Sequence, residues 1–370
     1  MVALFMDIPE HYGGAERRLA RIFNEIARRR SDVEFVAIST PEYMERFFQV
    51  SLNGNNFHKT TILKRPHTLG LFTGKLWVMR ICRHLIKRRY RTVVYFDSSR
   101  FSVVFNILAF LFRIKTLIVI ANYLPAHGMH IGKEKSYFEY SIKTAAHVDC
   151  LYPSAEKRLK EIFPKKKITI TPNSFTDLKR FAPGKKERVM VFAAARLSKS
   201  KNPHLLVETL NVIQDKIREH GYKVFICGGG YDLEALVNRV KDNGTHDIIS
   251  FPGNVNMDSY LPQAEVFFSL QTNDNYPSQA LLEAISCGCY IIATDVGETK
   301  RLADGISFSS LIDNDKQSLA SAILNYLELS EDEKSVSVRL AREFAEKNFL
   351  LETSVNYFAD IIQTMTNTPK

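Results

Sequence analysis

The fold is decided by the stretch Val189-Met-Val-Phe-Ala-Ala-Ala-Arg196-Leu-Ser-Lys-Ser-Lys201-Asn-Pro203, which joins a strand, a loop and a helix start. Its apolar first part predicts a strand over Val189–Ala194, and a strand that is apolar throughout is typical of a sheet buried on both faces. A helix is expected to begin near Pro203, since proline suits the first helical turn. Strand, loop and helix in this order are the repeating unit of an α/β domain with a parallel sheet.

The same alternation continues on both sides of this stretch. Downstream, the pattern predicts further strands at Lys223–Cys227, Ile248–Phe251, Val266–Ser269 and Tyr290–Thr294. Helices are expected between them at Leu205–Arg218, Tyr231–Lys241 and Gln279–Ser286. Upstream, the expected strands are Val2–Met6, Val33–Ile38, Thr92–Phe96, Thr116–Ile120, Asp149–Tyr152 and Ile168–Thr171, and the expected helices are Ala15–Arg29 and Tyr137–Ala146. This alternation implies parallel sheets that are covered by helices on both faces.

A polar linker near Pro183-Gly-Lys-Lys-Glu divides the chain, whose 370 residues suit two domains of ordinary size. We therefore expect a Rossmann-like N-terminal domain over 1–183 and a Rossmann-like C-terminal domain over 184–348. The remaining residues, 349–370, are expected to form a helix that packs back on the N-terminal domain. Two doubly wound domains leave a cleft between the carboxyl ends of their strands, where ligands bind in such folds.

The composition, with 45% hydrophobic and 24% charged residues, is that of a soluble globular protein. The longest apolar run, Phe101–Ile120, is interrupted by Arg113 and Lys115, so we interpret it as a buried helix followed by a buried strand. The N-terminus reads as a first strand without a leader, and none of the five cysteines forms a Cys-x-x-Cys pair. These features favour a cytoplasmic protein with buried thiols.

Charge is distributed unevenly along the chain. Residues 1–180 carry 31 Lys or Arg and 15 Asp or Glu, a balance of +16, whereas the remaining 190 residues carry 19 and 25, a balance of −6. The densest basic cluster spans residues 75–91, where Trp77, Ile81 and Leu85 follow helical spacing. This pattern is typical of a basic amphipathic helix that lies on anionic lipid. A surface helix that packs its apolar stripe on its own domain fits about as well, and the tryptophan beside the charges favours the membrane slightly.

Arg196 and Lys201 are the first candidates for chemistry. Both lie in the loop after a predicted strand, and two cations five residues apart can reach one diphosphate, the arginine as a planar fork and the lysine as a point charge. Together they would offset the charge of a departing diphosphate without a metal ion. A solvated basic loop is the plain alternative, but the position between a buried strand and a helix start favours a ligand site.

A run of glycines, Gly228-Gly229-Gly230, follows the strand Lys223–Cys227 and precedes a predicted helix. Doubly wound sheets approach phosphates and nucleotides with this arrangement. The signal is weak by itself, because any tight turn from a strand to a helix also uses glycines.

A third candidate is the segment Asn275-Tyr-Pro-Ser-Gln-Ala-Leu-Leu-Glu283, which runs into a predicted helix near Ser278. The free N–H groups of a helix start point toward an anion. Glu283 stands in an apolar stretch, where a carboxylate needs a partner, and two ribose hydroxyls would serve as donors. A helix-surface glutamate is the alternative.

Short motifs follow one another in an ordered set. In the second half they are Arg196…Lys201-Asn, Gly228-Gly-Gly, Phe251-Pro-Gly-Asn-Val, Ala264-Glu-Val-Phe-Phe-Ser, Leu282-Glu-Ala-Ile-Ser-Cys-Gly and Ile292-Ala-Thr-Asp-Val-Gly. In the first half they are Gly13-Gly14-Ala-Glu-Arg and Ile168-Thr-Ile-Thr-Pro-Asn173. The set resembles the retaining glycosyltransferases of family 4, within glycosyl transferases group 1. This resemblance spans nearly the whole chain and implies a GT-B fold, with two Rossmann-like domains and an interdomain cleft.

The resemblance also implies roles for the matching positions. Arg196 and Lys201 would bind the diphosphate of a nucleoside-diphosphate sugar, and Glu283 would bind its ribose. The other positions that it assigns to the donor are Gly13, Gly14, Gly229, Gly230, Asn254, Val255, Ser278, Gln279 and Ala280.

Two positions depart from the family's pattern. Asn275 stands where a glutamate usually contacts the transferred sugar, and an amide cannot stabilise positive charge as a carboxylate does. Either the adjacent Asp274 takes this place or the enzyme works with Asn275. The family often has a histidine after its fourth strand, and here Asn122 follows that strand while His127 lies in the next loop. We take Asn275 and His127 as candidate catalytic residues beside Arg196 and Lys201.

The implied activity is transfer of a hexose, with retention of configuration, to a saccharide or a lipid-linked saccharide in surface polysaccharide synthesis. No metal or organic cofactor is expected, and Asp315 in the motif Asp313-Asn-Asp315 is interpreted as a helix cap. The expected partners are the donor and the acceptor, and an anionic membrane surface reached through residues 75–91 is a further candidate. The protein is expected in the cytoplasm, with the inner membrane face as a candidate location. The alternatives are a protein that binds a nucleotide sugar or lipid without transfer, and a sugar-nucleotide epimerase. Nucleic acid is disfavoured, because aromatic residues do not alternate with the charges.

Overall fold

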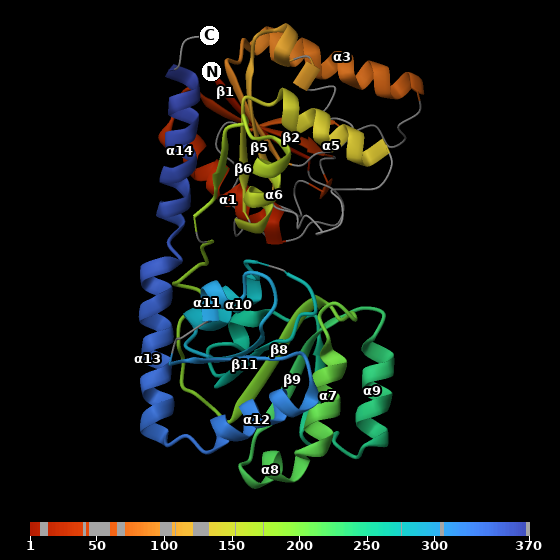
Figure 1. Ribbon diagram of the computed structural model, residues 1–370, viewed down its shortest axis with the longest axis vertical. Coiled ribbons are helices and arrows are strands. Elements are labelled where there is room, and N and C mark those ends of the chain that lie inside the picture. Colours follow the sequence, from red (N-terminus) through yellow and green to blue (C-terminus); the bar gives the residue numbers. More distant parts are fainter. Residues whose placement is uncertain are drawn as a thin grey trace. The chain divides into compact units, whose positions relative to one another are not determined.

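The computed structural model describes residues 1–7, 14–39, 42–43, 60–64, 71–96, 106–107, 109–120, 133–151, 153–172, 174–274, 276–303 and 307–367 (Figure 1). The chain divides into two compact units. The first unit consists of Met1–Pro172 and Glu352–Lys370, and the second consists of Asn173–Leu351. Each unit is a parallel sheet covered by helices, so the predicted α/β class is confirmed.

The first unit contains a seven-stranded sheet in the order β3-β2-β1-β4-β5-β6-β7. Its strands are β1 (Val2–Asp7), β2 (Val33–Ser39), β3 (Thr60–Lys64), β4 (Thr92–Phe96), β5 (Lys115–Ile120), β6 (His147–Cys150) and β7 (Ile168–Ile170). Every neighbouring pair is parallel. The helices with given bounds are α1 (Gly14–Arg29), α3 (Leu71–Arg88), α5 (Lys133–Thr144), α6 (Pro153–Ile162) and α14 (Leu351–Asn367). The strand order reverses between β1 and β4, as in other doubly wound sheets.

The C-terminal helix α14 packs on the first unit (Figure 1). Phe358 of α14 is fully buried, and its ring meets Phe23 of α1 edge-on, with 6.3 Å between the ring centroids. Glu352 forms an ion pair with Arg29 of α1, with 2.6 Å between the nitrogen and the oxygen. The helix α14, near the end of the chain, therefore packs in the same core as α1, near its beginning.

A buried polar network lies where α14 meets the sheet. Asp149 of β6 is fully buried and accepts hydrogen bonds from Thr169, Thr171 and Tyr357 of α14. Thr169 also bonds the Nε2 atom of His147, at 3.0 Å. Burial raises the pKa of Asp149 to about 6 and lowers the pKa of His147 to about 4, because an apolar environment disfavours either charge.

The second unit contains a six-stranded parallel sheet in the order β10-β9-β8-β11-β12-β13. Its strands are β8 (Val189–Arg196), β9 (Lys223–Gly229), β10 (Ile249–Gly253), β11 (Val266–Ser269), β12 (Tyr290–Thr294) and β13 (Ser309–Ile312). Its helices are α7 (Pro203–Val212), α8 (Gln214–Glu219), α9 (Leu233–Asp242), the short η1 (Met257–Ser259), α10 (Gln279–Ser286), α11 (Lys300–Ala303), α12 (Lys316–Leu327) and α13 (Glu331–Asn348). The central strands are apolar and buried, as predicted for a sheet covered on both faces.

Local sequence explains where two of these helices begin. Asp315 caps α12, because its carboxylate accepts the backbone N–H of Ser318 at 2.9 Å, which confirms its predicted role. Ser330 and Glu333 form a reciprocal capping box at the start of α13. Side chains thus satisfy backbone donors that the first turn of each helix leaves free.

Two expectations about elements were wrong, and two strands were missed. The helix predicted over Leu205–Arg218 is two helices, because the backbone of Ile213 leaves the helical conformation between α7 and α8. The strands β3 and β13 were not predicted at all. The helix predicted to be buried before β5 is only partly buried over its described residues, since Asn106 and Ala109 are buried whereas Phe110 and Leu111 are 77% and 65% exposed.

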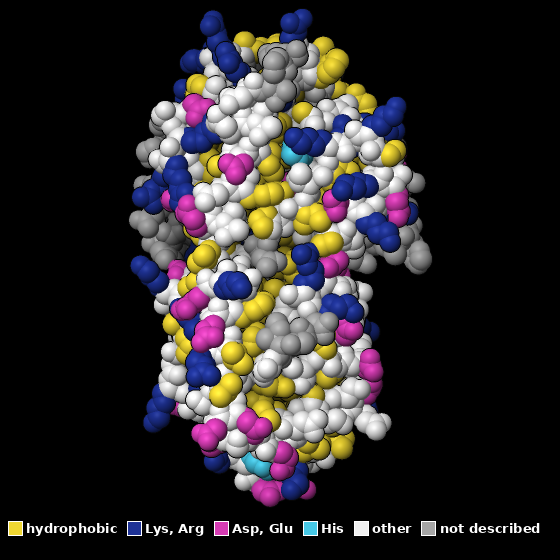
Figure 2. Space-filling model, turned by 60° about the vertical axis from the view of Figure 1, so that its left-hand side comes forward, with side chains coloured by type: hydrophobic (Ala, Val, Ile, Leu, Met, Phe, Trp, Pro, Cys, Tyr) yellow, Lys and Arg dark blue, Asp and Glu magenta, His cyan; other side chains and the backbone are white. Residues whose placement is uncertain are grey.

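Within the parts of the chain that the structure describes, every helix is too short or too polar to cross a lipid bilayer. Figure 2 shows Lys and Arg side chains spread over the first unit and a group of Asp and Glu side chains at the lower end of the second. This distribution follows the uneven charge of the sequence.

Candidate functional site

The strand order of the second unit defines where a ligand would bind. Strand β8 has β9 on one side and β11 on the other, so the chain leaves β8 and β11 in opposite directions at the same edge of the sheet. Doubly wound sheets bind ligands in the crevice outside the carboxyl ends of such strands. The loops that flank this crevice are 197–202 after β8 and 270–278 after β11.

Arg196 and Lys201, predicted as the diphosphate pair, lie at this crevice. Arg196 is the last residue of β8, stands opposite Gly229 in the register of the sheet, and is exposed. It forms no ion pair with any residue in the described part of the chain. Lys201 is half-buried, and its Nζ atom donates a hydrogen bond of 2.9 Å to Oε1 of Gln271. The loop after β8 therefore presents two cations to the crevice.

The charge of Lys201 is poorly compensated. Its pKa lies below the ordinary value, first because the side chain is partly buried and second because Arg196 is positive. Gln271, which accepts its hydrogen bond, is neutral. An anion placed between the two cations would stabilise both of them and raise the pKa of Lys201 again. The arrangement is suited to binding a diphosphate and to stabilising its negative charge as it leaves.

The loop that carries Lys201 is held in one conformation. The N–H groups of Lys201 and Asn202 donate to the carbonyl of Ser198, and the N–H of Thr272 donates to the carbonyl of Ser200 at 3.0 Å. Asn202 has a left-handed backbone, with φ of 56°, and its side-chain amide donates to Asn314 at 2.8 Å. These bonds position the lysine before a ligand arrives, which reduces the ordering that binding requires.

The glycines after β9 are explained first by packing. A Cβ atom on Gly228 would lie 1.9 Å from the carbonyl oxygen of Ala194, and φ of Gly228 is +135°. Gly230 has φ of +130°, and its Cβ atom would lie 3.0 Å from the carbonyl oxygen of Leu197. These two positions allow β8 and β9 to approach each other closely. Gly229 and Gly230 nevertheless remain at the edge of the crevice, where they were predicted to contact the donor.

Asn254 and Val255 follow β10 at the same edge of the sheet. The side chain of Asn254 is exposed and lies over Gly229, where an added Cβ atom would be 3.1 Å from its amide nitrogen. Three neighbouring strands, β8, β9 and β10, therefore bring Arg196, Gly229 and Asn254 together.

On the other side of the crevice, α10 begins at Gln279 after an extended Ser278. Ser278, Gln279 and Ala280 are half-buried, as is Glu283 one turn further on. Glu283 has buried neighbours in the chain on either side, Leu282 and Ala284, so its carboxylate is held at the boundary of the core. The helix start and Glu283 are thus positioned beside the crevice by β11 and its loop.

Asp274 has a local structural role. Its Oδ1 atom accepts the backbone N–H of Tyr276 at 3.1 Å. Its side chain also lies directly over Gly297, where an added Cβ atom would be 2.2 Å from Cγ. The carboxylate that we considered as a substitute for the missing glutamate therefore helps to shape the loop before α10.

Some predicted site residues lie outside the described residues. They are Gly13, His127 and Asn275. Gly14 is the first residue of α1 in the first unit. Sequence reasoning missed Gln271, which is buried and supplies the one hydrogen bond found for the Nζ atom of Lys201 among the described residues. Its only sequence signal is a polar side chain placed two residues after the end of β11.

The second unit also carries a recognisable sequence pattern. Residues 175–341 match the model of a family described as glycosyl transferases group 1. The match covers just under half of the chain and includes Arg196, Lys201 and Glu283. No curated protein matches the chain in sequence.

The whole chain resembles several solved structures. The Anabaena protein Alr3699/HepE in complex with UDP aligns with a TM-score of 0.79 at 15% identity, covering 98% of this chain and 100% of that one. A glycosyltransferase from Rickettsia africae aligns with a TM-score of 0.78 at 14% identity, and sucrose-phosphate synthase from Thermosynechococcus elongatus with 0.75 at 15% identity, each covering 99% of both chains. The chain has the GT-B fold, as predicted.

Proposed function

We propose that the protein is a glycosyltransferase of group 1 that moves a hexose from a nucleoside-diphosphate sugar to a saccharide or lipid-linked saccharide. The observation that carries this proposal is the pair Arg196 and Lys201, which lies at the reversal of strand order without an acidic partner among the described residues. The same pair falls inside the segment that matches the family model, which supports the proposal independently of the charges.

The chemistry assigned to these residues is leaving-group stabilisation. As the bond between the sugar and the diphosphate breaks, negative charge grows on the phosphate oxygens, and Arg196 and Lys201 would offset it in place. The N–H groups at the start of α10 would add partial positive charge, and Glu283 would accept hydrogen bonds from the ribose. These residues would position the donor and stabilise the charge of its leaving group. We also propose that the transfer retains the configuration of the sugar.

Relatives of known structure indicate which donor to test first. Alr3699/HepE has been solved with UDP and glucose and with UDP-glucose. WaaG, which aligns with a TM-score of 0.69 at 13% identity, is involved in lipopolysaccharide biosynthesis. We propose a UDP-hexose as the donor and surface polysaccharide synthesis as the process, with the protein in the cytoplasm at the inner membrane face.

The direct test is release of nucleoside diphosphate from a panel of donors, with and without a membrane extract as the source of acceptor. UDP-glucose, UDP-galactose, UDP-N-acetylglucosamine, GDP-mannose and ADP-glucose cover the common bases and sugars. We expect release that depends on the extract and disappears in a variant with Arg196→Gln and Lys201→Gln. Lys199→Gln removes an exposed cation from the same loop and is the matched control. Release that survives the double variant would contradict the assignment of these two residues.

A binding protein without transfer activity is the second candidate, because Asn275 stands where a carboxylate was expected. In that case isothermal titration would detect binding of a donor while no donor releases its nucleoside diphosphate. The same incubations followed by proton NMR test the two remaining points. A new nucleotide sugar would indicate an epimerase, and the anomeric signal of a product reports retention or inversion.

A further inference from the structure

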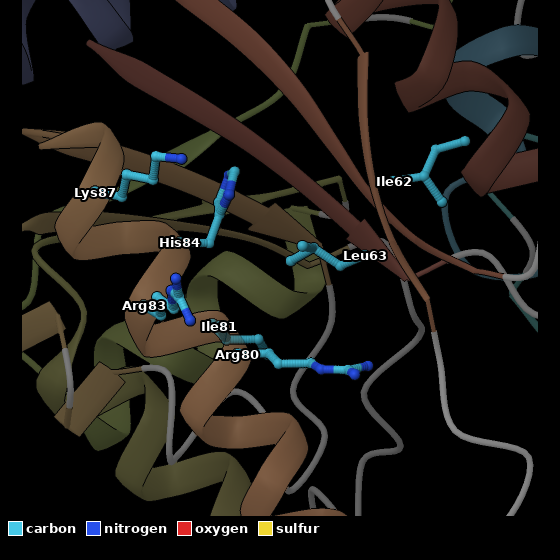
Figure 3. Close-up of a pocket in the computed structure, with 7 residues that line it drawn as sticks. All are labelled: Ile62, Leu63, Arg80, Ile81, Arg83, His84 and Lys87. Carbon is cyan, nitrogen blue, oxygen red and sulfur yellow. The ribbon is translucent and has the colours of Figure 1, made fainter.

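A pocket of about 450 Å³ lies in the first unit, between β3 and α3 (Figure 3). Strand β3 supplies two aliphatic residues, and α3 supplies a third together with all the polar ones. The lining residues are Ile62, Leu63, Arg80, Ile81, Arg83, His84 and Lys87. Three of them are permanent cations and none is acidic, so the pocket has a strongly positive wall over an apolar floor.

The cations share one face of α3. Arg80, Arg83, His84 and Lys87 are spaced so that they lie above one another on successive turns. Like charges at this spacing repel and destabilise a helix. The three cations are exposed, and among the described residues none of them forms an ion pair. An arrangement that lowers the stability of the helix in the free protein is expected where a ligand supplies the missing negative charge.

The next residue along the helix behaves differently. Arg88 forms an ion pair with the buried Glu34, with 3.4 Å between the nitrogen and the oxygen. Glu34 also accepts hydrogen bonds from the hydroxyls of Tyr90, at 2.7 Å, and of Thr61. Glu34 therefore has three partners of its own, and it forms no ion pair with Arg80, Arg83 or Lys87 among the described residues.

The same network holds one wall of the pocket. The hydroxyl of Tyr90 donates to Glu34, so its oxygen accepts from Nε2 of His84, at 3.0 Å. This hydrogen bond fixes the position of the imidazole ring beside the pocket. Ile81 is buried beneath it, which keeps this part of α3 attached to the unit.

We propose that this pocket binds the phosphate of an amphiphilic anion. Planar guanidinium groups from Arg80 and Arg83 match phosphate oxygens, and Lys87 adds a point charge. The apolar part of the ligand would lie along the aliphatic residues that line the pocket, which are Ile62 and Leu63 of β3 and Ile81 of α3. This site is separate from the donor site in the second unit. The proposal does not depend on whether the protein transfers a sugar. The lipid headgroup and the free phosphate share this chemistry, and the two arms of the experiment separate them.

The test compares two variants that each lose three positive charges. Arg80→Gln, Arg83→Gln and Lys87→Gln empty the pocket wall, whereas Lys143→Gln, Lys157→Gln and Lys165→Gln remove three exposed cations elsewhere in the same unit. Binding to vesicles of phosphatidylglycerol mixed with phosphatidylcholine is measured by sedimentation, and binding of glycerol 3-phosphate by calorimetry. No donor is present, so a failed transferase assay would leave the result untouched. Circular dichroism and thermal melting check that each variant is folded, and Arg83→Ala alone serves if the triple variant is not.

We expect the pocket variant to bind the anionic vesicles roughly 100-fold more weakly than the wild type, and the control variant to stay within about threefold. Loss of vesicle binding without any binding of glycerol 3-phosphate identifies a lipid headgroup as the source of the phosphate. Binding of glycerol 3-phosphate that the pocket variant loses identifies a site for soluble phosphates. Equal losses in both variants, or no binding of either ligand to the wild type, would overturn the proposal.

Discussion

Asp149 in the first unit and Lys201 in the second are both withdrawn from water, and the protein compensates their charges in opposite ways. Asp149 is fully buried and accepts three hydrogen bonds from hydroxyl groups. Lys201 has one neutral acceptor and a second cation nearby. A buried polar group whose partners are complete holds the fold together, whereas one whose partners are incomplete indicates a place for a ligand. The predictions below test this difference, beginning with the largest effect.

Lys201→Met should separate activity from stability. We expect kcat/KM for the donor to fall about 100- to 1000-fold, as when one electrostatic contact to a transition state is lost. The free energy of unfolding should change by less than about 1 kcal/mol, because burial and Arg196 already disfavour the charge of this lysine. Nucleoside-diphosphate release and urea denaturation measure the two quantities.

Lys199→Met is the matched control for this prediction, because Lys199 is exposed in the same loop. It should leave both activity and stability unchanged. A loss of several kcal/mol in the free energy of unfolding of Lys201→Met would mean that Lys201 holds its loop together, and the contrast with Asp149 would disappear.

Tyr357→Phe should show the opposite pattern. The change removes a donor from the buried Asp149 and leaves one of its lone pairs unsatisfied. We expect the free energy of unfolding to fall by about 1.5–3 kcal/mol, the range for a hydrogen bond to a charged group. Urea denaturation measures it, and Tyr140→Phe, at a half-exposed position of α5, is the control. If the free energy of unfolding falls equally in both variants, the hydrogen bond from Tyr357 to Asp149 contributes no more than an exposed tyrosine hydroxyl does.

Asp149 and His147 should give the stability of the first unit two opposing dependences on pH. The pKa of Asp149 is raised to about 6, so the folded state takes up its proton first, and this contribution to stability is lost as the pH rises through about 6. The pKa of His147 is lowered to about 4, so its contribution is present above its ordinary value of 6.5 and is lost as the pH falls toward 4. Between pH 4 and 6 the two contributions oppose each other.

In the wild type the two contributions largely cancel. A variant that keeps only one of the two groups should therefore show a clear dependence of the free energy of unfolding on pH. In Asp149→Asn the free energy of unfolding should rise by about 1–2 kcal/mol from pH 4.5 to 6.5, because only the histidine titrates. In His147→Gln it should fall by about the same amount over the same range, because only the carboxyl group titrates. Urea denaturation at four pH values gives both slopes. If the free energy of unfolding of both variants changed with pH in the same direction, burial would not be the cause of the two pKa shifts.

Strands could be predicted from the sequence where they are buried. Thr92–Phe96, Val266–Ser269 and Tyr290–Thr294 have the predicted bounds, because each is a short apolar run between polar turns. The edge strands β7 and β10 were predicted, so an edge position does not explain why β3 and β13, at the opposite edges, were missed; β3 and β13 each begin with two hydroxyl residues and have two apolar residues. Their sequences, Thr-Thr-Ile-Leu-Lys and Ser-Ser-Leu-Ile, are accordingly more polar.

The candidate site was predictable to the extent that it depends on chain order. Arg196 and Lys201 follow a strand directly, so their place at the edge of a sheet could be inferred. The contact between Lys201 and Gln271 could not, because it arises from the pairing of β8 with β11, which lie 70 residues apart at this contact. The pairing of strands that are not consecutive is set by the packing of the whole unit, and a single sequence carries no local signal for it.

The smallest predicted effect is at Ser330. It tests whether burial is the reason that the hydroxyl of Tyr357 contributes strongly to the free energy of unfolding. Ser330 caps α13 of the second unit, and its hydroxyl donates to the carboxylate of Glu333 as the hydroxyl of Tyr357 donates to Asp149, but Ser330 is exposed. Ser330→Ala should lower the free energy of unfolding by about 1 kcal/mol, since water replaces part of what an exposed cap provides. Ser335→Ala, at an exposed position inside the same helix, should be neutral or slightly stabilising, because alanine has the higher helix propensity. A loss at Ser330 as large as that at Tyr357 would mean that local geometry, and not withdrawal from water, determines how much such a hydroxyl contributes.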